Sequence, residues 1–259
     1  MPDTTTADFV AAPEEEEERE LPKMSFLEHL EELRKRLLIS IVAIFAAFIG
    51  CWYVADKIFA WLAQPLSKYL PAGEKLVYTR LTEPFMLYMK VAFYAAIFVA
   101  APVILWQLWL FISPGLYKRE RRYAAPFIII ASLFFILGGY FGWRVLLPGM
   151  CQFFLSTGTQ FRQMIKADEF LSFASTVVLA AGLVFETPIL ILFLAKLGIV
   201  TPQFLLKGWK WAIVGAFIIS AIVTPSPDPV NQTALAAPII GLYFIGVAVA
   251  FIFGKKQTA

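Results

Sequence analysis

The sequence has only one histidine, His29, and only two cysteines, Cys51 and Cys151. A single histidine excludes a multi-histidine metal site, and the cysteines have neither metal-ligand spacing nor the pattern of a disulfide framework. We interpret both cysteines as buried or without a function. Because no serine or cysteine in the apolar segments has a candidate base, we predict that the chain is not an enzyme and uses no metal or cofactor.

Charge is also scarce in this chain. Of its 259 residues, 16% are charged and 59% are hydrophobic, and the formal net charge is +3. A soluble domain of this length could not bury so much apolar surface in one core. The single basic cluster lies between apolar runs, which argues against a nucleic-acid partner. The composition predicts a polytopic membrane protein surrounded by the lipid bilayer.

Six apolar segments are long enough, or nearly so, to cross a bilayer. No alternating pattern of the kind a transmembrane barrel needs is present, so we predict an all-α fold in which residues 37–253 form six transmembrane helices. An even number of spans places both termini on one side of the membrane. The predicted spans cover residues 37–55, 85–112, 123–147, 170–197, 209–223 and 234–253, with Asp168 as the N-cap of the fourth.

The distribution of Lys and Arg predicts the orientation. Fourteen of the 22 basic residues lie in segments on the same side as the N-terminus, including the loop "YKRERRY". The positive-inside rule therefore places both termini, and the tail at 254–259, in the cytoplasm. Residues 1–23 contain "PEEEEERE" and no signal peptide, so we predict a disordered acidic tail.

Residues 24–36, "MSFLEHLEELRKR", combine an apolar stripe with many charges. We predict an amphipathic helix that lies along the cytoplasmic surface before the chain turns into the bilayer. Glu32 and Arg36 have the i,i+4 spacing of a helical ion pair. Helix support therefore remains an alternative role for the acids of this segment.

The fifth and sixth predicted helices look short. Residues 209–223 would span only about 22 Å, against a hydrocarbon thickness of about 30 Å. Pro238 leaves only residues 239–253 uninterrupted in the sixth span. We predict a thinned bilayer or a docked protein partner here. The alternative, that the helices extend into "TPSPDPVNQT", is opposed by the prolines of that loop.

Glu186 is the only carboxylate deep within a predicted span. A charge near the bilayer midplane is costly, so such a residue normally faces protein or water, or stays protonated, and is a functional candidate. The alternative is a neutral Glu186 that hydrogen-bonds Gln107 or a carbonyl exposed by Pro188. Together with Glu32 and Glu120, Glu186 would suit a ligand with a cationic end and an apolar body, because carboxylates bind guanidinium groups in bidentate fashion.

Four motifs closely resemble the TatC family, the polytopic subunit of the twin-arginine protein translocase. They are "FLEHLEELRKRLL", "APVILWQLWLFISPGLYKRERR", "FETPI" and "VGAF" with "TPSPD", and the similarity extends over residues 24–253. The resemblance implies a receptor for signal peptides with two consecutive arginines in the cytoplasmic (inner) membrane. It further implies export of folded proteins by the proton-motive force, with single-span TatA- and TatB-type partners and self-association.

The resemblance also implies roles for individual residues. Glu32 and Glu120 would contact the arginine pair, and Glu186 matches the buried acid of an intramembrane groove. The surface around the arginines would include Arg34, Phe111, Pro114, Leu116 and Arg122. Pro65 and Asp228 match outer-loop positions of the family. Thr224 and Gln232 match a surface on which partner proteins dock. The loop that contains Asp228 is one residue longer than the family form.

A secondary transporter with Glu186 as its proton or cation site is the alternative function. Such folds usually have paired repeats and several polar groups at the membrane midplane. No repeat relates the first three spans to the last three, and only Gln107 accompanies Glu186.

Overall fold

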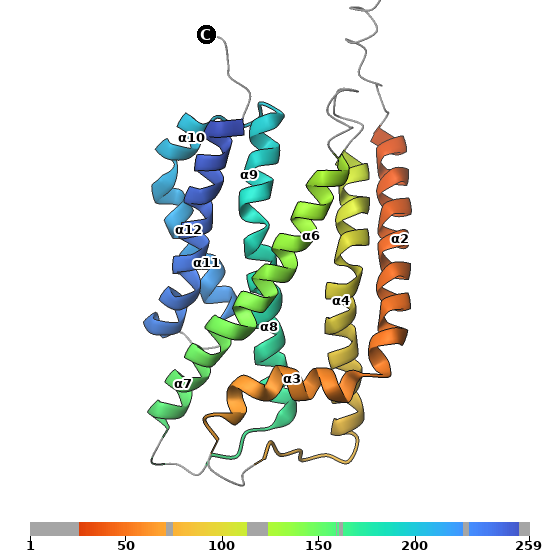
Figure 1. The fold of residues 1–259 in the computed structure, drawn as a ribbon, viewed down its shortest axis with the longest axis vertical. Coiled ribbons are helices and arrows are strands. Elements are labelled where there is room, and N and C mark those ends of the chain that lie inside the picture. Colours follow the sequence, from red (N-terminus) through yellow and green to blue (C-terminus); the bar gives the residue numbers. More distant parts are fainter. Residues whose placement is uncertain are drawn as a thin grey trace, which may run out of the picture.

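The computed structural model describes residues 26–70, 75–112, 124–158, 160, 163–224 and 228–253. Most of these residues form helices, and the one β-type pairing among the described residues is an isolated bridge between Val77 and Lys166. The all-α prediction is therefore confirmed for the described part of the chain. The helices are α2 (Phe26–Trp52), α3 (Ala55–Ser67), α4 (Glu83–Ile112), α6 (Ala124–Phe141), the π-helical segment η2 (Gly142–Leu146), α7 (Leu147–Thr157), α8 (Ala167–Phe185), α9 (Thr187–Lys196), α10 (Pro202–Lys207), α11 (Trp209–Val223) and α12 (Pro229–Phe253) (Figure 1).

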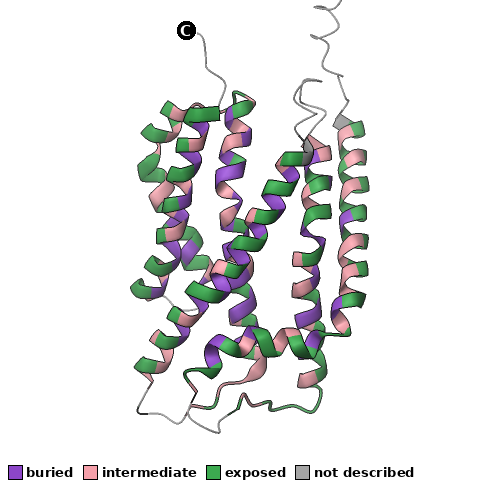
Figure 2. Ribbon diagram, in the orientation of Figure 1, coloured by how far each residue is buried: buried purple, intermediate pink, exposed green. Residues whose placement is uncertain are grey.

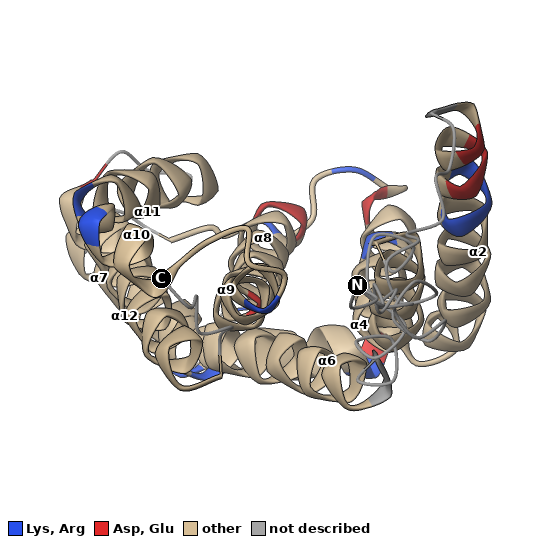
Figure 3. Cartoon of the chain, turned by 90° about the horizontal axis from the view of Figure 1, so that it is seen from above, with Lys and Arg blue, Asp and Glu red and all other residues tan. Residues whose placement is uncertain are grey.

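In the described part of the chain, five helical stretches are long and apolar enough to cross a membrane, and α11 is a shorter apolar helix of fifteen residues. Seen from above, α2 and α4 lie at one edge, α10, α11 and α12 lie at the opposite edge, and α8 and α9 stand between them (Figure 3). The first turn of α2 and the last turn of α12 are at the same end of the molecule (Figure 1). We call this the α2-start end; α3 lies across the opposite end.

The first helix differs from the prediction. Residues 26–52 form one uninterrupted α-helix, so the expected turn between a surface helix and the first span is absent. The segment contains no proline, and its first glycine is Gly50, so nothing in its sequence breaks the helix near residue 37. Helix α2 packs mainly against α4 and remains largely exposed (Figure 2).

Helix α11 has the predicted bounds, whereas the prediction of a short sixth helix is wrong. Helix α12 begins at Pro229 and continues through Pro238 for 25 residues, a length of about 37 Å. Transmembrane helices tolerate an internal proline because neighbouring groups can satisfy the freed backbone carbonyl. Helix α12 therefore starts within the loop whose prolines were expected to prevent it.

Helix α3 lies in the segment predicted as an outer loop. Pro65 is buried near its end, and Trp61 stacks on Trp143 of the π-helical segment, with ring centroids 4.1 Å apart. The Trp143 indole also donates a hydrogen bond to the Trp61 carbonyl at 3.2 Å. These contacts fix α3 across the third span, which continues to Thr157 instead of ending near residue 147.

Ion pairing replaces the predicted cap at the start of α8. The N-cap residue is Lys166, and Asp168 lies in the first helical turn. Its carboxylate accepts a hydrogen bond from the Lys90 ammonium of α4 at 2.6 Å, so it joins two helices. Cys51 and Cys151 are buried free thiols, as predicted.

Candidate functional site at the start of helix α2

Glu32 lies on α2 within the first turns, at the α2-start end. Its side chain is 15% exposed, and its Oε1 forms an ion pair with Arg36 Nη2 at 3.0 Å. The predicted i,i+4 pair is therefore confirmed. The other carboxylate oxygen, Oε2, is buried and accepts no hydrogen bond from the described residues. Glu32 thus retains an acceptor able to bind a further donor.

Arg36 links α2 to α4. Its Nη1 donates a hydrogen bond to the side-chain oxygen of Gln107 at 3.3 Å, and its Nε is buried without a hydrogen-bond partner among the described residues. Gln107 is itself buried. Helix α4 therefore holds the guanidinium group of Arg36 against Glu32.

An aromatic stack between α2 and α4 lies next to the contact of Glu32, Arg36 and Gln107, toward the first turn of α2. The rings of His29 and Phe111 are nearly parallel, with an interplanar angle of 16° and centroids 4.3 Å apart. His29 precedes Glu32 by three residues and Phe111 follows Gln107 by four, so the stack lies about one turn from the ion pair on both helices. We call His29, Glu32, Arg36, Gln107 and Phe111 the α2–α4 seam.

The remaining residues of the predicted arginine-binding surface have other positions. Arg34 is exposed on α2. Glu120, Pro114, Leu116 and Arg122 lie outside the described residues. The helices that flank their segment, α4 and α6, end and begin at the α2-start end (Figure 1).

Glu186 occupies the break between α8 and α9 and is 8% exposed. Its backbone carbonyl accepts hydrogen bonds from the amides of Ile189 and Leu190, and the new helical segment α9 begins at Thr187 with Pro188 in its first turn. The carboxyl Oε1 is buried and has no hydrogen-bond partner in the described part of the chain. The described residues show no hydrogen bond between Glu186 and Gln107, and the Gln107 side-chain oxygen accepts one from Arg36 instead.

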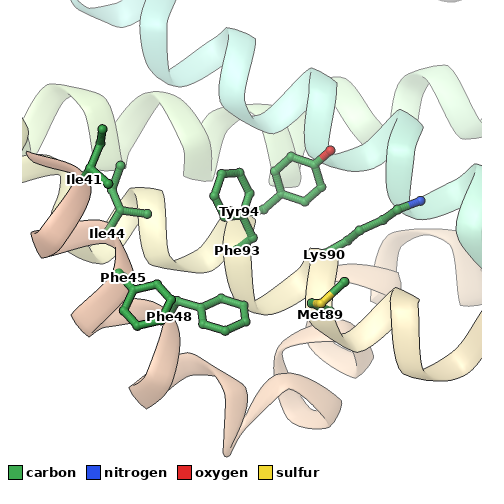
Figure 4. Close-up of a pocket in the computed structure, with 8 residues that line it drawn as sticks. All are labelled: Ile41, Ile44, Phe45, Phe48, Met89, Lys90, Phe93 and Tyr94. Atoms are coloured by element: carbon green, nitrogen blue, oxygen red, sulfur yellow. The ribbon is translucent and has the colours of Figure 1, made fainter. Parts of the chain in front are cut away.

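An apolar groove lies along α2 and α4, on the side of the ion pair between Lys90 and Asp168 (Figure 4). Lys90 is its one charged lining residue, and its ammonium is held by Asp168 of α8. The groove therefore offers almost entirely apolar contacts. Its lining consists of Ile41, Ile44, Phe45, Phe48, Met89, Lys90, Phe93 and Tyr94.

Comparison with known proteins identifies the family of this chain. Residues 28–238 match the family model of the Sec-independent protein translocase protein (TatC). The TatC protein of Koribacter versatilis is 44% identical over 240 residues, covering 92% of this chain and 89% of the relative. The TatC protein of Desulforapulum autotrophicum is 39% identical over 242 residues, covering 93% of this chain and 89% of the relative. This chain belongs to the TatC family.

Solved structures support the same assignment. A crystal structure of the twin arginine translocase receptor TatC superimposes with a TM-score of 0.77 at 36% identity, covering 87% of this chain and 99% of that one. A second crystal structure of the twin arginine translocase receptor TatC, in DDM, superimposes with a TM-score of 0.79 at 35% identity. The match covers 88% of this chain and 100% of that one. The chain is thus a multi-pass membrane component of a Sec-independent protein translocase and not an enzyme. Membership of the TatC family leaves no support for the small-solute transporter.

The residues that the TatC resemblance placed at outer loops and at a docking surface have internal partners here. The Thr224 hydroxyl is buried and donates to the Ser220 carbonyl at 2.7 Å, and the Ser220 hydroxyl donates to the Gln232 carbonyl at 2.6 Å. Asp228 accepts hydrogen bonds from the backbone and side-chain amides of Asn231 at 2.8 and 2.9 Å. These bonds join α11 to α12 and stabilise the first turn of α12, while Gln232 remains half-buried.

Sequence reasoning missed two members of the α2–α4 seam. The sequence indicates Gln107 only as a possible partner of Glu186, and it indicates no contact for His29. Both residues have a polar or aromatic side chain near a helix end: Gln107 lies in the last turns of α4 and His29 in the first turns of α2. This position is the one feature of the sequence that could have indicated their contacts. That signal becomes specific only when the packing of the two helices is known.

Proposed function

We propose that this TatC protein is a receptor for twin-arginine signal peptides and binds the arginine pair through Glu32 and Glu120. The observation that carries the proposal is the buried Oε2 of Glu32, which has no hydrogen-bond partner among the described residues. A buried acceptor without a donor is costly, and a guanidinium group of a ligand would satisfy it. The similarity to a solved twin arginine translocase receptor supports the same ligand.

The rest of a signal peptide is apolar, and the two helices of the seam supply an apolar surface. The groove of Figure 4 is lined by residues of α2 and α4, which also carry Glu32 and Phe111. A ligand with a cationic end and an apolar body can therefore contact both regions. Glu186, buried at the α8–α9 break, serves a later step of transport rather than the first contact.

The proposal places the α2-start end in the cytoplasm of a cell that carries this protein in its cytoplasmic (inner) membrane. The helices flanking the tail at 1–23, the basic loop and the tail at 254–259 all have ends there (Figure 1). Fourteen of the 22 basic residues are predicted on that side, which supports both termini as cytoplasmic.

Single-span TatA- and TatB-type proteins are the proposed partners, with the proton-motive force as the energy source. Helix α11 has fifteen residues, and several of its apolar side chains are exposed, including Trp211 and Ile222 at 80% and 79%. A helix this short thins the bilayer or needs a neighbour, which supports docking of a partner helix near Gln232. The exposed apolar faces of α2 likewise support self-association.

Replacing Glu32 with glutamine should weaken signal-peptide binding about tenfold or more, because a charge-assisted hydrogen bond contributes about 1.5–3 kcal/mol. The measurement is the fluorescence anisotropy of a labelled twin-arginine signal peptide titrated with the protein in lipid nanodiscs. Glu31→Gln is the matched control, since Glu31 is exposed on the same helix. Equal dissociation constants for Glu32→Gln and the wild type would reject Glu32 as the site.

A further inference from the structure

Arg36 occupies part of the site that the signal-peptide arginine is proposed to enter. We propose that Arg36 is an internal placeholder: its guanidinium binds Glu32 in the empty receptor and is displaced by the guanidinium of the incoming signal peptide. This inference rests on the proposed function, and it adds a step of competition within the receptor itself.

The contact between Arg36 and Glu32 uses half of the carboxylate. One guanidinium nitrogen, Nη2, lies 3.0 Å from Oε1, while Oε2 has no hydrogen-bond partner in the described part of the chain. Arg36 directs its Nη1 to Gln107, so only Nη2 of its terminal nitrogens contacts Glu32 in this structure. An incoming arginine free to approach in the bidentate geometry makes a better contact with the same carboxylate.

A placeholder is needed because Glu32 is only 15% exposed. A largely buried carboxylate with no positive partner is strongly unfavourable, whereas a paired one is tolerated. Arg36 therefore keeps the empty site stable. When a second guanidinium arrives, Arg36 can leave Glu32 without losing every partner, because the oxygen of Gln107 still accepts its hydrogen bond.

The pair is also weak enough to be exchanged. Glu32 and Arg36 share a single contact of 3.0 Å, so the pair lacks the bidentate geometry that makes arginine–carboxylate contacts strong. A competitor of this strength lowers the affinity for the peptide by about two- to fivefold. Release of the peptide after delivery is faster for the same reason, since Arg36 can return to Oε1.

The test is a double-mutant cycle on Glu32 and Arg36 in the full-length protein in lipid nanodiscs. The dissociation constant of a twin-arginine signal peptide is measured for the wild type, Arg36→Gln, Glu32→Gln and the double variant. Lys35→Gln is the matched control, because Lys35 is exposed beside Arg36 and its loss removes the same charge. Thermal unfolding of each variant verifies that it is folded.

We expect Arg36→Gln to tighten peptide binding about two- to fivefold relative to Lys35→Gln, and this gain to vanish when Glu32 is already glutamine. Unchanged or weaker binding by folded Arg36→Gln would overturn the placeholder and make Arg36 a supporting residue. A gain that persists in the Glu32→Gln background would overturn it too, since the effect would then be general electrostatics. If Glu32→Gln alone leaves binding unchanged, the proposed receptor site itself fails.

Discussion

Export by the Glu186→Ala variant is expected to fall about tenfold or more, the size of a typical coupling between two sites of a protein. The affinity for the signal peptide should stay within about twofold, because no hydrogen bond among the described residues joins Glu186 to the α2–α4 seam. The measurement compares transport of a folded reporter into membrane vesicles with peptide binding by the same variant.

The loss of export by this variant should not be accompanied by a loss of stability. A buried carboxyl oxygen without a hydrogen bond costs about 1–3 kcal/mol, so its removal should leave the unfolding temperature unchanged or raise it. Glu186→Gln, which retains the size of the side chain, is the control for packing. Wild-type export by Glu186→Ala would return the residue to a purely structural role at the break between α8 and α9.

Gly138→Val is expected to destabilise the protein by about 1–3 kcal/mol or more. A Cβ atom at this position of α6 would lie 2.6 Å from the Ala181 carbonyl oxygen and 2.7 Å from Phe185 Cβ of α8. Because the Ala181 carbonyl oxygen belongs to the backbone, it can move away from the added Cβ atom only if α6 and α8 separate. Close crossings of transmembrane helices depend on such small residues.

Thermal unfolding in nanodiscs tests this crossing, with Gly149→Val as the matched control. Gly149 belongs to α7 of the same span, and a Cβ there meets no atom within 4 Å. The two variants introduce the same side chain, so their difference isolates the contact with α8. Equal unfolding temperatures for both variants would contradict the packing of α6 on α8.

The bounds of a helix in this protein could be predicted where neighbouring residues in the sequence determine them. The bounds of α11 agree with the prediction because Gly208 precedes it and Pro225 follows Thr224. The prediction of a short sixth span is wrong because α12 passes through Pro238, whereas an internal proline breaks most helices of water-soluble proteins. Helix α2 was divided because its composition changes near residue 37, although composition alone does not bend a backbone.

The candidate site was predictable only in its local part. The spacing of Glu32 and Arg36 on one helix predicts their ion pair. The contact of Arg36 with Gln107 joins residues 71 positions apart, and it depends on how α2 and α4 pack. Asp168 illustrates the same limit, because the cap position was inferred from its neighbours in sequence while its partner, Lys90, comes from another helix.

The most direct test of the account compares two signal peptides that differ only in the arginine pair. The dissociation constants of the intact peptide and of one with both arginines replaced by glutamine are measured against the wild-type protein in nanodiscs. Loss of two charge-assisted contacts should weaken binding about a hundredfold or more. Equal affinity for the two peptides would contradict the claim that carboxylates at the α2-start end bind paired guanidinium groups.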